Sequence, residues 1–525
     1  MTCCGFTRAT GVARAGAFSG LAFLVGALGC REISHSRPNV IVVSMAAGPN
    51  NLDPRVATDD YSDKTAQLIF NNLMDLDEHM RVVPGLAERL DQASPIKYIA
   101  TLRKGVRFHD GHELTSADVV HTFRSFLDPE FASPRKGGYR ELASVDAFDR
   151  YTVVFTLKEP FASFPINLVM PIIPATADSK FGEKPTGTGP YRFLRYFVDD
   201  RVEFEAFADY FAGRPANDGV TLRIVPDDVM RGLELRKGTT DLVVNDLAPD
   251  IVNQLRHQKT LQVVEAPGVD YQYLGLNLRD PILKDVRVRQ ALAYAIDRNS
   301  IVEHLRRGLA VPAVGMLPRL SWAMAPDLES FNHEPTRAKA LLDEAGHPDP
   351  DGPGPFPRFR LTLKISSTEF NRLQATVIQE NLQMVGIGLD VRTYEFATLY
   401  ADVLSGNFQL YSLQWTGGSL ADPDILRRVF HSSQIPPVGF NRGHFSNVQV
   451  DRFLDEAAAS TDEGSRAKHY ADAQREIARE VPYISLWHKT NVTVAQRSVT
   501  GIHLSPLADY QFLKEVARVP VGAAN

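Results

Sequence analysis

Residues 102–120 read LRKGVRFHDGHELTSADVV, and this stretch contains a strand end, a tight turn and a helix start. Alternating polar and apolar residues from 97 to 108 predict a β-ribbon that ends at an Asp-Gly turn pair. Thr115 can then cap a helix, and Asp118, three positions later, favours the positive end of the helix dipole. The stretch therefore predicts a change from β-structure to helix at this point of the chain.

The same alternation of strands and helices continues on both sides of this stretch. Residues 39–45 (NVIVVSM) read as a buried strand, and residues 61–76 have helical periodicity. Farther along, a strand at 361–366, a helix at 371–385 and a strand at 388–394 form a βαβ unit. Such alternation indicates α/β lobes built on a mixed sheet.

The composition is that of an ordinary globular protein. The chain has 525 residues, of which 44% are hydrophobic and 23% charged, with a net charge of −6. At about 150 residues per domain, this length suggests about three domains. The negative net charge argues against nucleic acid as the main partner, because binding to phosphates needs a concentrated positive field.

The first 29 residues have the features of a targeting segment. Residues 15–29 (AGAFSGLAFLVGALG) are apolar or small, and they are too few for a membrane-spanning helix, which needs about 20. The segment ends in Ala-Leu-Gly before Cys30, which resembles the signal of a bacterial lipoprotein. Cys30 would be the only cysteine of the mature chain, so we expect residues 1–29 to be cleaved and Cys30 to be lipidated. A plain signal peptide is the alternative, and the polar residues 30–38 read as a tether.

Several motifs follow one another in an order typical of one protein family. The blocks are Asn51–Pro54, Val82–Ala87, Leu102–Gly111, Leu114–Val120, Gly187–Tyr191, Tyr273–Asn277 and Asp285–Arg298. The ordered set resembles the extracellular solute-binding proteins of family 5, the peptide-, dipeptide- and nickel-binding subunits of bacterial ABC importers. The resemblance implies an α/β, two-lobed periplasmic-binding-protein fold of type II, with an extra subdomain in the first lobe.

The resemblance also implies how the chain is divided. The first lobe is expected to comprise residues 39–270, completed by 490–525, with the extra subdomain at about 61–186. Residues 271–489 are then expected to form the second lobe. The two lobes would be joined where the chain crosses between them, near 270 and near 490, so that they can close over a ligand.

The function implied by the resemblance is capture of a solute, not catalysis. We expect a monomer that binds a peptide or peptide-like small molecule in an interlobe cleft and delivers it to ABC permease subunits. No cofactor or metal is expected, and the lipid anchor would hold the protein at a bacterial membrane, in the periplasm or at the cell surface. A peptide-sensing receptor lipoprotein without transport and a secreted hydrolase are the alternatives. The hydrolase would need a nucleophile–base pair or a metal site, and no motif for either is found.

The segment Trp415-Thr416-Gly417-Gly418 is the main ligand-binding candidate. It follows a predicted strand at 408–414, and in dipeptide-binding family members a matching tryptophan segment lines the cleft. Those members carry an aspartate three positions after the tryptophan, which binds the peptide α-amino group; here that position is Gly418, and Asp422 is the nearest acid. The carboxylate-binding arginine of the dipeptide binders, expected before residue 371, is also missing. We therefore expect weak binding of dipeptides and better binding of longer or capped ligands.

The remaining candidates are weaker. Ala46, Ala47 and Gly48 match the first cleft loop of the family, which could pair with a peptide backbone. Tyr273 belongs to one of the family blocks, and we expect it to be a ligand-binding residue. His109-x-x-His112 has a metal-like spacing, but the adjacent turn explains it better, since a metal site needs several convergent ligands.

Overall fold

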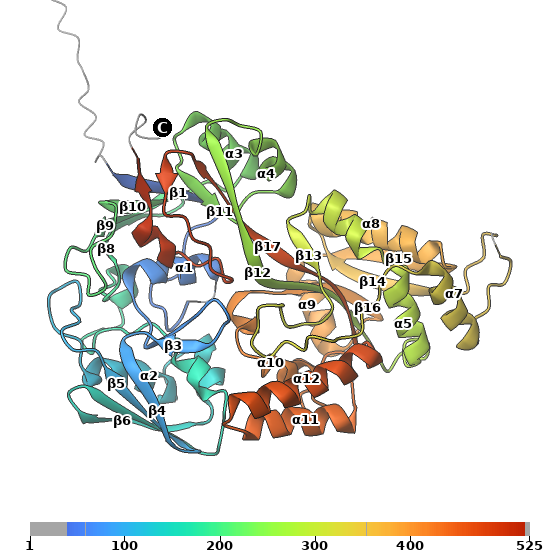
Figure 1. Cartoon of the computed structure of the whole chain (residues 1–525), viewed down its shortest axis with the longest axis horizontal. Helices are drawn as coiled ribbons and strands as arrows, with labels where there is room; N and C mark the ends of the chain where they lie inside the picture. Colours follow the sequence, from blue (N-terminus) through green and yellow to red (C-terminus); the bar gives the residue numbers. More distant parts are fainter. Residues whose placement is uncertain (1–38, 58, 353, 520–525) are drawn as a thin grey trace, which may run out of the picture. The chain divides into compact units, whose positions relative to one another are not determined.

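The computed structural model describes residues 39–57, 59–352 and 354–519, and the predictions for the signal segment, Cys30 and the tether lie outside these residues. The described part of the chain forms one compact unit from Asn39 onward (Figure 1). Within it, no helix combines the length and the apolar character needed to cross a bilayer.

The centre of the unit is a mixed sheet in the strand order β15-β14-β16-β12-β17-β11-β1-β10-β9-β8, with β13 added beside β17. Its strands are β1 (Val40–Met45), β8 (Tyr191–Phe197), β9 (Arg201–Ala206), β10 (Gly219–Ile224), β11 (Leu242–Val244), β12 (Leu261–Leu276), β13 (Ala310–Pro312), β14 (Phe359–Ser366), β15 (Ile387–Tyr394), β16 (Leu410–Trp415) and β17 (Tyr483–Gln496). Neighbours from distant parts of the sequence show that both chain ends contribute to one sheet.

The two longest strands of this sheet, β12 and β17, connect its two ends. They pair in antiparallel fashion from Leu261↔Gln496 to Gly275↔Tyr483, and the pairing is interrupted between Pro267 and Tyr271. Figure 1 shows them running side by side from the part that holds β1 and β11 to the part that holds β14 and β16. They are the strands that cross between the two predicted lobes.

Helices and short helical turns surround the strands. The α-helices are α1 (Asp60–Ile69), α2 (Ser116–Leu127), α3 (Asp228–Lys237), α4 (Pro249–Leu255), α5 (Val286–Ala295), α6 (Arg298–Ser300), α7 (Pro335–Glu344), α8 (Glu369–Gln383), α9 (Phe396–Ser405), α10 (Ile425–Phe430), α11 (Val448–Ala459) and α12 (Glu463–Glu480). Shorter turns are η1 (Pro134–Tyr139), η2 (Phe164–Leu168), η3 (Phe181–Glu183), η4 (Ile301–Leu305), η5 (Gly417–Leu420) and η6 (Gln511–Glu515).

A separate four-stranded sheet, in the order β4-β5-β7-β6, lies in the first third of the chain. Its strands are β4 (Ala87–Ser94), β5 (Lys97–Leu102), β6 (Leu142–Asp149) and β7 (Thr152–Leu157), and the small pairs β2 (Met74–Leu76) with β3 (Val82–Pro84) and β18 (Val499–Thr500) with β19 (Ala517–Arg518) complete the strands. The four-stranded sheet and α2 share a hydrophobic core that runs from Leu73 to Ile172. This core spans fewer residues than the subdomain predicted at about 61–186, because the buried apolar residues of α1 pack in a different core.

The hydrophobic cores support the predicted division into lobes, which remains a prediction. One core joins residues between 41 and 244 with residues between 495 and 516, so both chain ends pack together. Two further cores are formed almost entirely by residues between 269 and 487. This grouping follows from the order of the strands in the sheet. After the residues of the second predicted lobe, β17 brings the chain back beside β11, which belongs to the first.

The helix start predicted at Thr115 is confirmed. α2 begins at Ser116, and the Thr115 backbone N–H donates to Asp118 Oδ2 at 2.8 Å, which satisfies a donor at the helix start. The helix predicted over 61–76 is too long, because α1 ends at Ile69 and β2 begins at Met74. Leu73 and Met74 continue the apolar spacing of the helix, but they belong to a different core.

The histidines of the metal-like motif serve the fold. His109 lies against the glycine bend: its Nε2 is 3.0 Å from the Gly189 carbonyl oxygen, and its Nδ1 accepts the Gly187 N–H at 3.3 Å. Burial lowers the pKa of His109 to about 4, so the ring is neutral at pH 7 and fits both contacts. His112 instead contacts Asp110. Among the described residues no three potential ligands converge on a metal position.

Candidate functional site

The predicted ligand segment begins at the last residue of β16, where Trp415 pairs with Tyr271 of β12. The Trp415 ring is partly buried and packs edge-on against Phe440, with ring centroids 5.2 Å apart. The guanidinium carbon of Arg442 lies 5.2 Å from the Trp415 centroid. The indole Nε1 is buried and has no hydrogen-bond partner among the described residues, so it remains an unsatisfied donor.

The two glycines after Trp415 leave the backbone open. A Cβ atom built on Gly417 or Gly418 would meet no atom within 4 Å. Gly417 has a φ of 48°, a conformation that favours glycine, and its N–H donates to Asp270 Oδ1 at 2.9 Å. Gln414 holds the other oxygen of Asp270 at 3.0 Å. The segment is thus fixed through the Gly417 N–H by Asp270, and open space lies beside both glycines.

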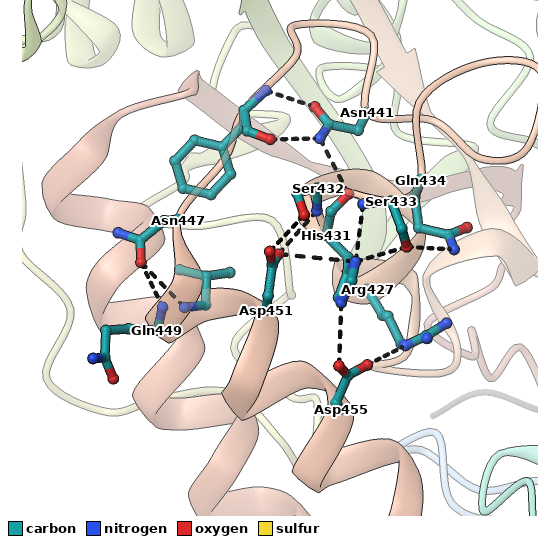
Figure 2. Close-up of polar contacts among 12 residues, drawn as sticks. Arg427, His431, Ser432, Ser433, Gln434, Asn441, Asn447, Gln449, Asp451 and Asp455 are labelled. Atoms are coloured by element: carbon teal, nitrogen blue, oxygen red, sulfur yellow. Dashed lines mark hydrogen bonds and ion pairs between the residues drawn. The ribbon is translucent and has the colours of Figure 1, made fainter.

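Phe440 and Arg442, which contact Trp415, lie on a loop that is fixed by the polar network of Figure 2. The Asn441 side chain donates to the carbonyl oxygens of His431 and Phe445, at 3.1 and 2.7 Å, and so holds both ends of this turn. Asp451 of α11 accepts the Ser432 N–H at 2.9 Å. These contacts bind the loop to α11 and fix the surface on which the indole rests.

The same network brings a serine, a histidine and an aspartate together, which bears on the hydrolase alternative. His431 Nδ1 is 2.8 Å from Ser433 Oγ, and Nε2 is 3.3 Å from Asp455 Oδ2 (Figure 2). However, the backbone N–H of Ser433 also donates to Nδ1, at 3.1 Å. The single lone pair of Nδ1 is therefore already used by the fold, and the ring is not placed to act as a general base for Ser433.

The second predicted segment, residues 46–48, follows β1. The Ala46 N–H donates to Asp246 Oδ2 at 3.0 Å, and the Tyr61 hydroxyl donates to Asp246 Oδ1 at 3.1 Å. Ala47 is exposed, whereas a Cβ atom on Gly48 would lie 2.4 Å from the Tyr196 hydroxyl oxygen. Close packing therefore explains the glycine. Like the tryptophan segment, this segment is held by a backbone N–H that donates to one aspartate, here Asp246.

Tyr273 has no exposed surface. It stacks on Tyr483 with centroids 4.2 Å apart, and its hydroxyl accepts a hydrogen bond from Arg442 Nη1 at 3.1 Å. Arg442 also donates to the Tyr400 hydroxyl at 3.2 Å. Tyr273 thus supports Arg442, which in turn supports Trp415, and direct contact of Tyr273 with a ligand would require these residues to move.

Asp422 lies in a contact between the segment that follows β7 and helix α12. Its Oδ1 accepts from Ser163 Oγ at 2.9 Å and from the Asp424 N–H at 2.7 Å. Arg466 of α12 donates to the same Ser163 hydroxyl at 2.8 Å. Burial raises the pKa of Asp422, and burial together with the neighbouring Asp422 charge raises that of Asp424 to about 7. These bonds give Asp422 a place in a contact between two parts of the fold.

Three site residues were not found from the sequence: Asp246, Asp270 and Lys489. Asp246 and Asp270 hold the two candidate segments, and both are among the charges that act on Lys489 of β17. Asp270 lies three residues before Tyr273, where a family block begins, and this is the one available signal. Nothing in the local sequence distinguishes Asp246 or Lys489 from surface charges.

The sequence profile of the bacterial extracellular solute-binding proteins, family 5 Middle, matches residues 81–437. The chain belongs to this family. The oligopeptide-binding protein AppA of Bacillus subtilis is 29% identical over 89% of this chain and 90% of its own length. The glutathione-binding protein GsiB of Escherichia coli (strain K12) is 30% identical over 90% and 93%. The solved structure of AppA in complex with a nonapeptide covers 91% of this chain and 98% of its own, with a TM-score of 0.74 and 28% identity.

The comparisons confirm the predicted family and the type II periplasmic-binding-protein fold. They also confirm that this family 5 protein is an extracytoplasmic solute-binding protein and not an enzyme, because its relatives bind solutes. Their ligands differ, since the structure of NikZ from Campylobacter jejuni, 25% identical with a TM-score of 0.76, is a complex with Ni(L-His). Membership of the family therefore establishes solute binding as the function, whereas the identity of the ligand depends on the residues of the site.

Proposed function

We propose that this family 5 protein binds peptides in a cleft between its lobes and delivers them to an ABC importer. The observation that carries the proposal is the open backbone of Gly417 and Gly418 beside Trp415, whose indole N–H has no partner. A peptide can pair with such a backbone while a side chain packs on the indole. The names of AppA and GsiB, an oligopeptide- and a glutathione-binding protein, support this ligand class.

The mechanism we infer is closure of the lobes about β12 and β17. The ligand would first contact one lobe, and bending of the two crossing strands would bring residues 46–48 and 415–418 to opposite sides of it. Closure involves no covalent step, because the ligand stabilises the closed state through non-covalent contacts alone. The permease would then recognise the closed form.

Ligand length is expected to determine affinity. Position 418 is a glycine, so the α-amino group of a dipeptide lacks the acidic partner expected there, whereas a longer peptide gains backbone hydrogen bonds with each added residue. Calorimetry over a series of alanine peptides should show weak binding of the dipeptide and tighter binding from about four residues onward. Tight binding of the dipeptide would instead show that the amino group has a different acidic partner.

We also propose that Cys30 carries the lipid anchor of the mature protein. The motivation is the small-residue site before Cys30 and the loss of Cys3 and Cys4 with the signal. Replacing Cys30 with serine should move the protein from the membrane fraction to the soluble fraction, because stable tethering takes about two or more acyl chains. If the Cys30→Ser protein stays in the membrane fraction, Cys30 is not the anchor.

A further inference from the structure

Lys489 is a partly buried lysine on β17, one of the two crossing strands. Among the described residues its ammonium group has neither a hydrogen-bond acceptor nor an ion-pair partner. The preceding His488 is buried, with Nε2 3.2 Å from the Gly315 carbonyl oxygen. Since side chains alternate along a strand, Lys489 points to the face opposite His488. Beside Lys489 in the sheet, the pairing of β12 with β17 is interrupted between Pro267 and Tyr271, and the Gly268 backbone packs closely against the Lys489 carbonyl.

The charges that act on Lys489 come from both predicted lobes. They are Asp270, Arg306, Lys64 and Asp246. Lys64 is already paired with Asp60, at 2.5 Å. The two aspartates are the residues that hold the candidate ligand segments, through the Ala46 N–H and the Gly417 N–H. Lys489 is therefore within electrostatic range of the two aspartates that hold the candidate segments.

Arg306 is a second cation without an acidic contact among the described residues. Its Nη2 donates to the Leu309 carbonyl oxygen at 3.1 Å, while its Nε is buried without a partner. Its guanidinium carbon lies 5.3 Å from the Phe370 ring centroid. The strand that follows, β13, pairs Ala310 with Lys489 and so brings Arg306 into the same region. Burial lowers the pKa of Arg306 to about 10, because the charged guanidinium is partly removed from water.

We propose that Lys489 and Arg306 form an anion subsite that binds a free carboxylate group of the ligand. Both cations are partly removed from water and have no acidic contact partner among the described residues, whereas Asp246 and Asp270 are each satisfied by two donors. An anion between them would gain charge-assisted hydrogen bonds in a site of reduced dielectric. Because two aspartates lie close by, a singly charged carboxylate fits better than a doubly charged phosphate. The proposal rests on the proposed peptide function and adds the carboxylate as a specific requirement. It replaces the expectation that a ligand capped at its carboxyl end binds better, because Lys489 and Arg306 would supply the cationic partner that the missing arginine does not.

The test compares tetra-alanine as the free acid and as the C-terminal amide by calorimetry. Wild-type protein should bind the acid at least about tenfold more tightly than the amide. Lys489→Gln should abolish this preference, and Lys489→Arg, which keeps the charge, should retain most of it. Arg307→Gln removes a neighbouring exposed charge paired with Asp250 and should leave the preference intact. Equal wild-type affinities for acid and amide, or equal losses for both in Lys489→Gln, would overturn the proposal.

A second readout separates this subsite from the peptide function. If tetra-alanine binds in neither form, the peptide proposal fails, and the subsite is then judged with N-acetyl-alanine and N-acetyl-alanine amide. The thermal midpoint of the wild type should rise with the acid and not with the amide, and Lys489→Gln should show neither rise. Lys489→Gln should itself fold normally, since it removes a poorly compensated charge. The absence of any shift dependent on Lys489 would count against the subsite.

Discussion

Replacing Trp415 with alanine should weaken ligand binding by at least about tenfold, because truncating an aromatic anchor typically costs about 2 kcal/mol or more. The indole is partly buried, its N–H has no partner, and an open glycine backbone follows it. A ligand packed there would cover the exposed part of the ring. Titration with tetra-alanine, followed by calorimetry, measures the change, and the wild-type tryptophan fluorescence should respond to the same titration.

The matched control is Trp487→Ala. Trp487 is 2% exposed, and its ring packs at a right angle to that of Phe370, with ring centroids 6.0 Å apart. It belongs to a hydrophobic core formed by residues between 274 and 487. Its truncation should cost about 3–5 kcal/mol of stability, whereas Trp415→Ala should lower the thermal midpoint much less. If Trp415→Ala destabilises as strongly as Trp487→Ala and leaves affinity intact, Trp415 is a core residue and not part of the ligand site.

Arg298→Met should destabilise the fold by about 3–5 kcal/mol, because it leaves buried acceptors without a donor. The Arg298 guanidinium donates to four backbone carbonyl oxygens, those of Ser485 at 2.6 Å, Phe331 at 2.8 Å, Ala293 at 2.9 Å and Ile296 at 3.3 Å. It thereby ties the end of α5 to β17. Chemical denaturation of the purified protein gives the free energy of unfolding directly.

Arg287→Met is the control for this variant. Arg287 belongs to the same family block, but it is largely exposed, and it bonds Asp285 and the Glu344 carbonyl oxygen. Its loss should change stability by no more than about 1 kcal/mol, as for other surface pairs. Equal effects of the two substitutions would mean that the carbonyl contacts of Arg298 are not what stabilises this junction.

The sequence predicts those parts of the fold that depend on local chemistry. Thr115 and Asp118 fix a helix start, and the strand predicted at 408–414 corresponds to β16, which runs from Leu410 to Trp415. The local spacing of apolar residues does not predict the end of a helix where two hydrophobic cores meet. Leu73 and Met74 keep the spacing of α1, yet they pack in the core of the four-stranded sheet. Periodicity shows that a residue is buried and does not show in which core.

The candidate site could be predicted only in part, for a related reason. The segments at 46–48 and 415–418 follow strands and carry recognisable residues. Asp246 and Asp270, which hold the segments, and Lys489 carry no such signal, because these residues become neighbours only through the pairing of β12 and β17 with the strands beside them. An isolated charge in the sequence looks the same whether it lies on the surface or between two lobes.

The most direct test of the central claim is native mass spectrometry of the purified protein, before and after incubation with a mixture of short peptides. If the chain is a peptide-binding member of family 5, the native mass should exceed the mass of the same preparation after denaturation by that of a bound peptide. Incubation should exchange this excess for peptides from the mixture. A chain that keeps its bare mass both as purified and after incubation would contradict the account.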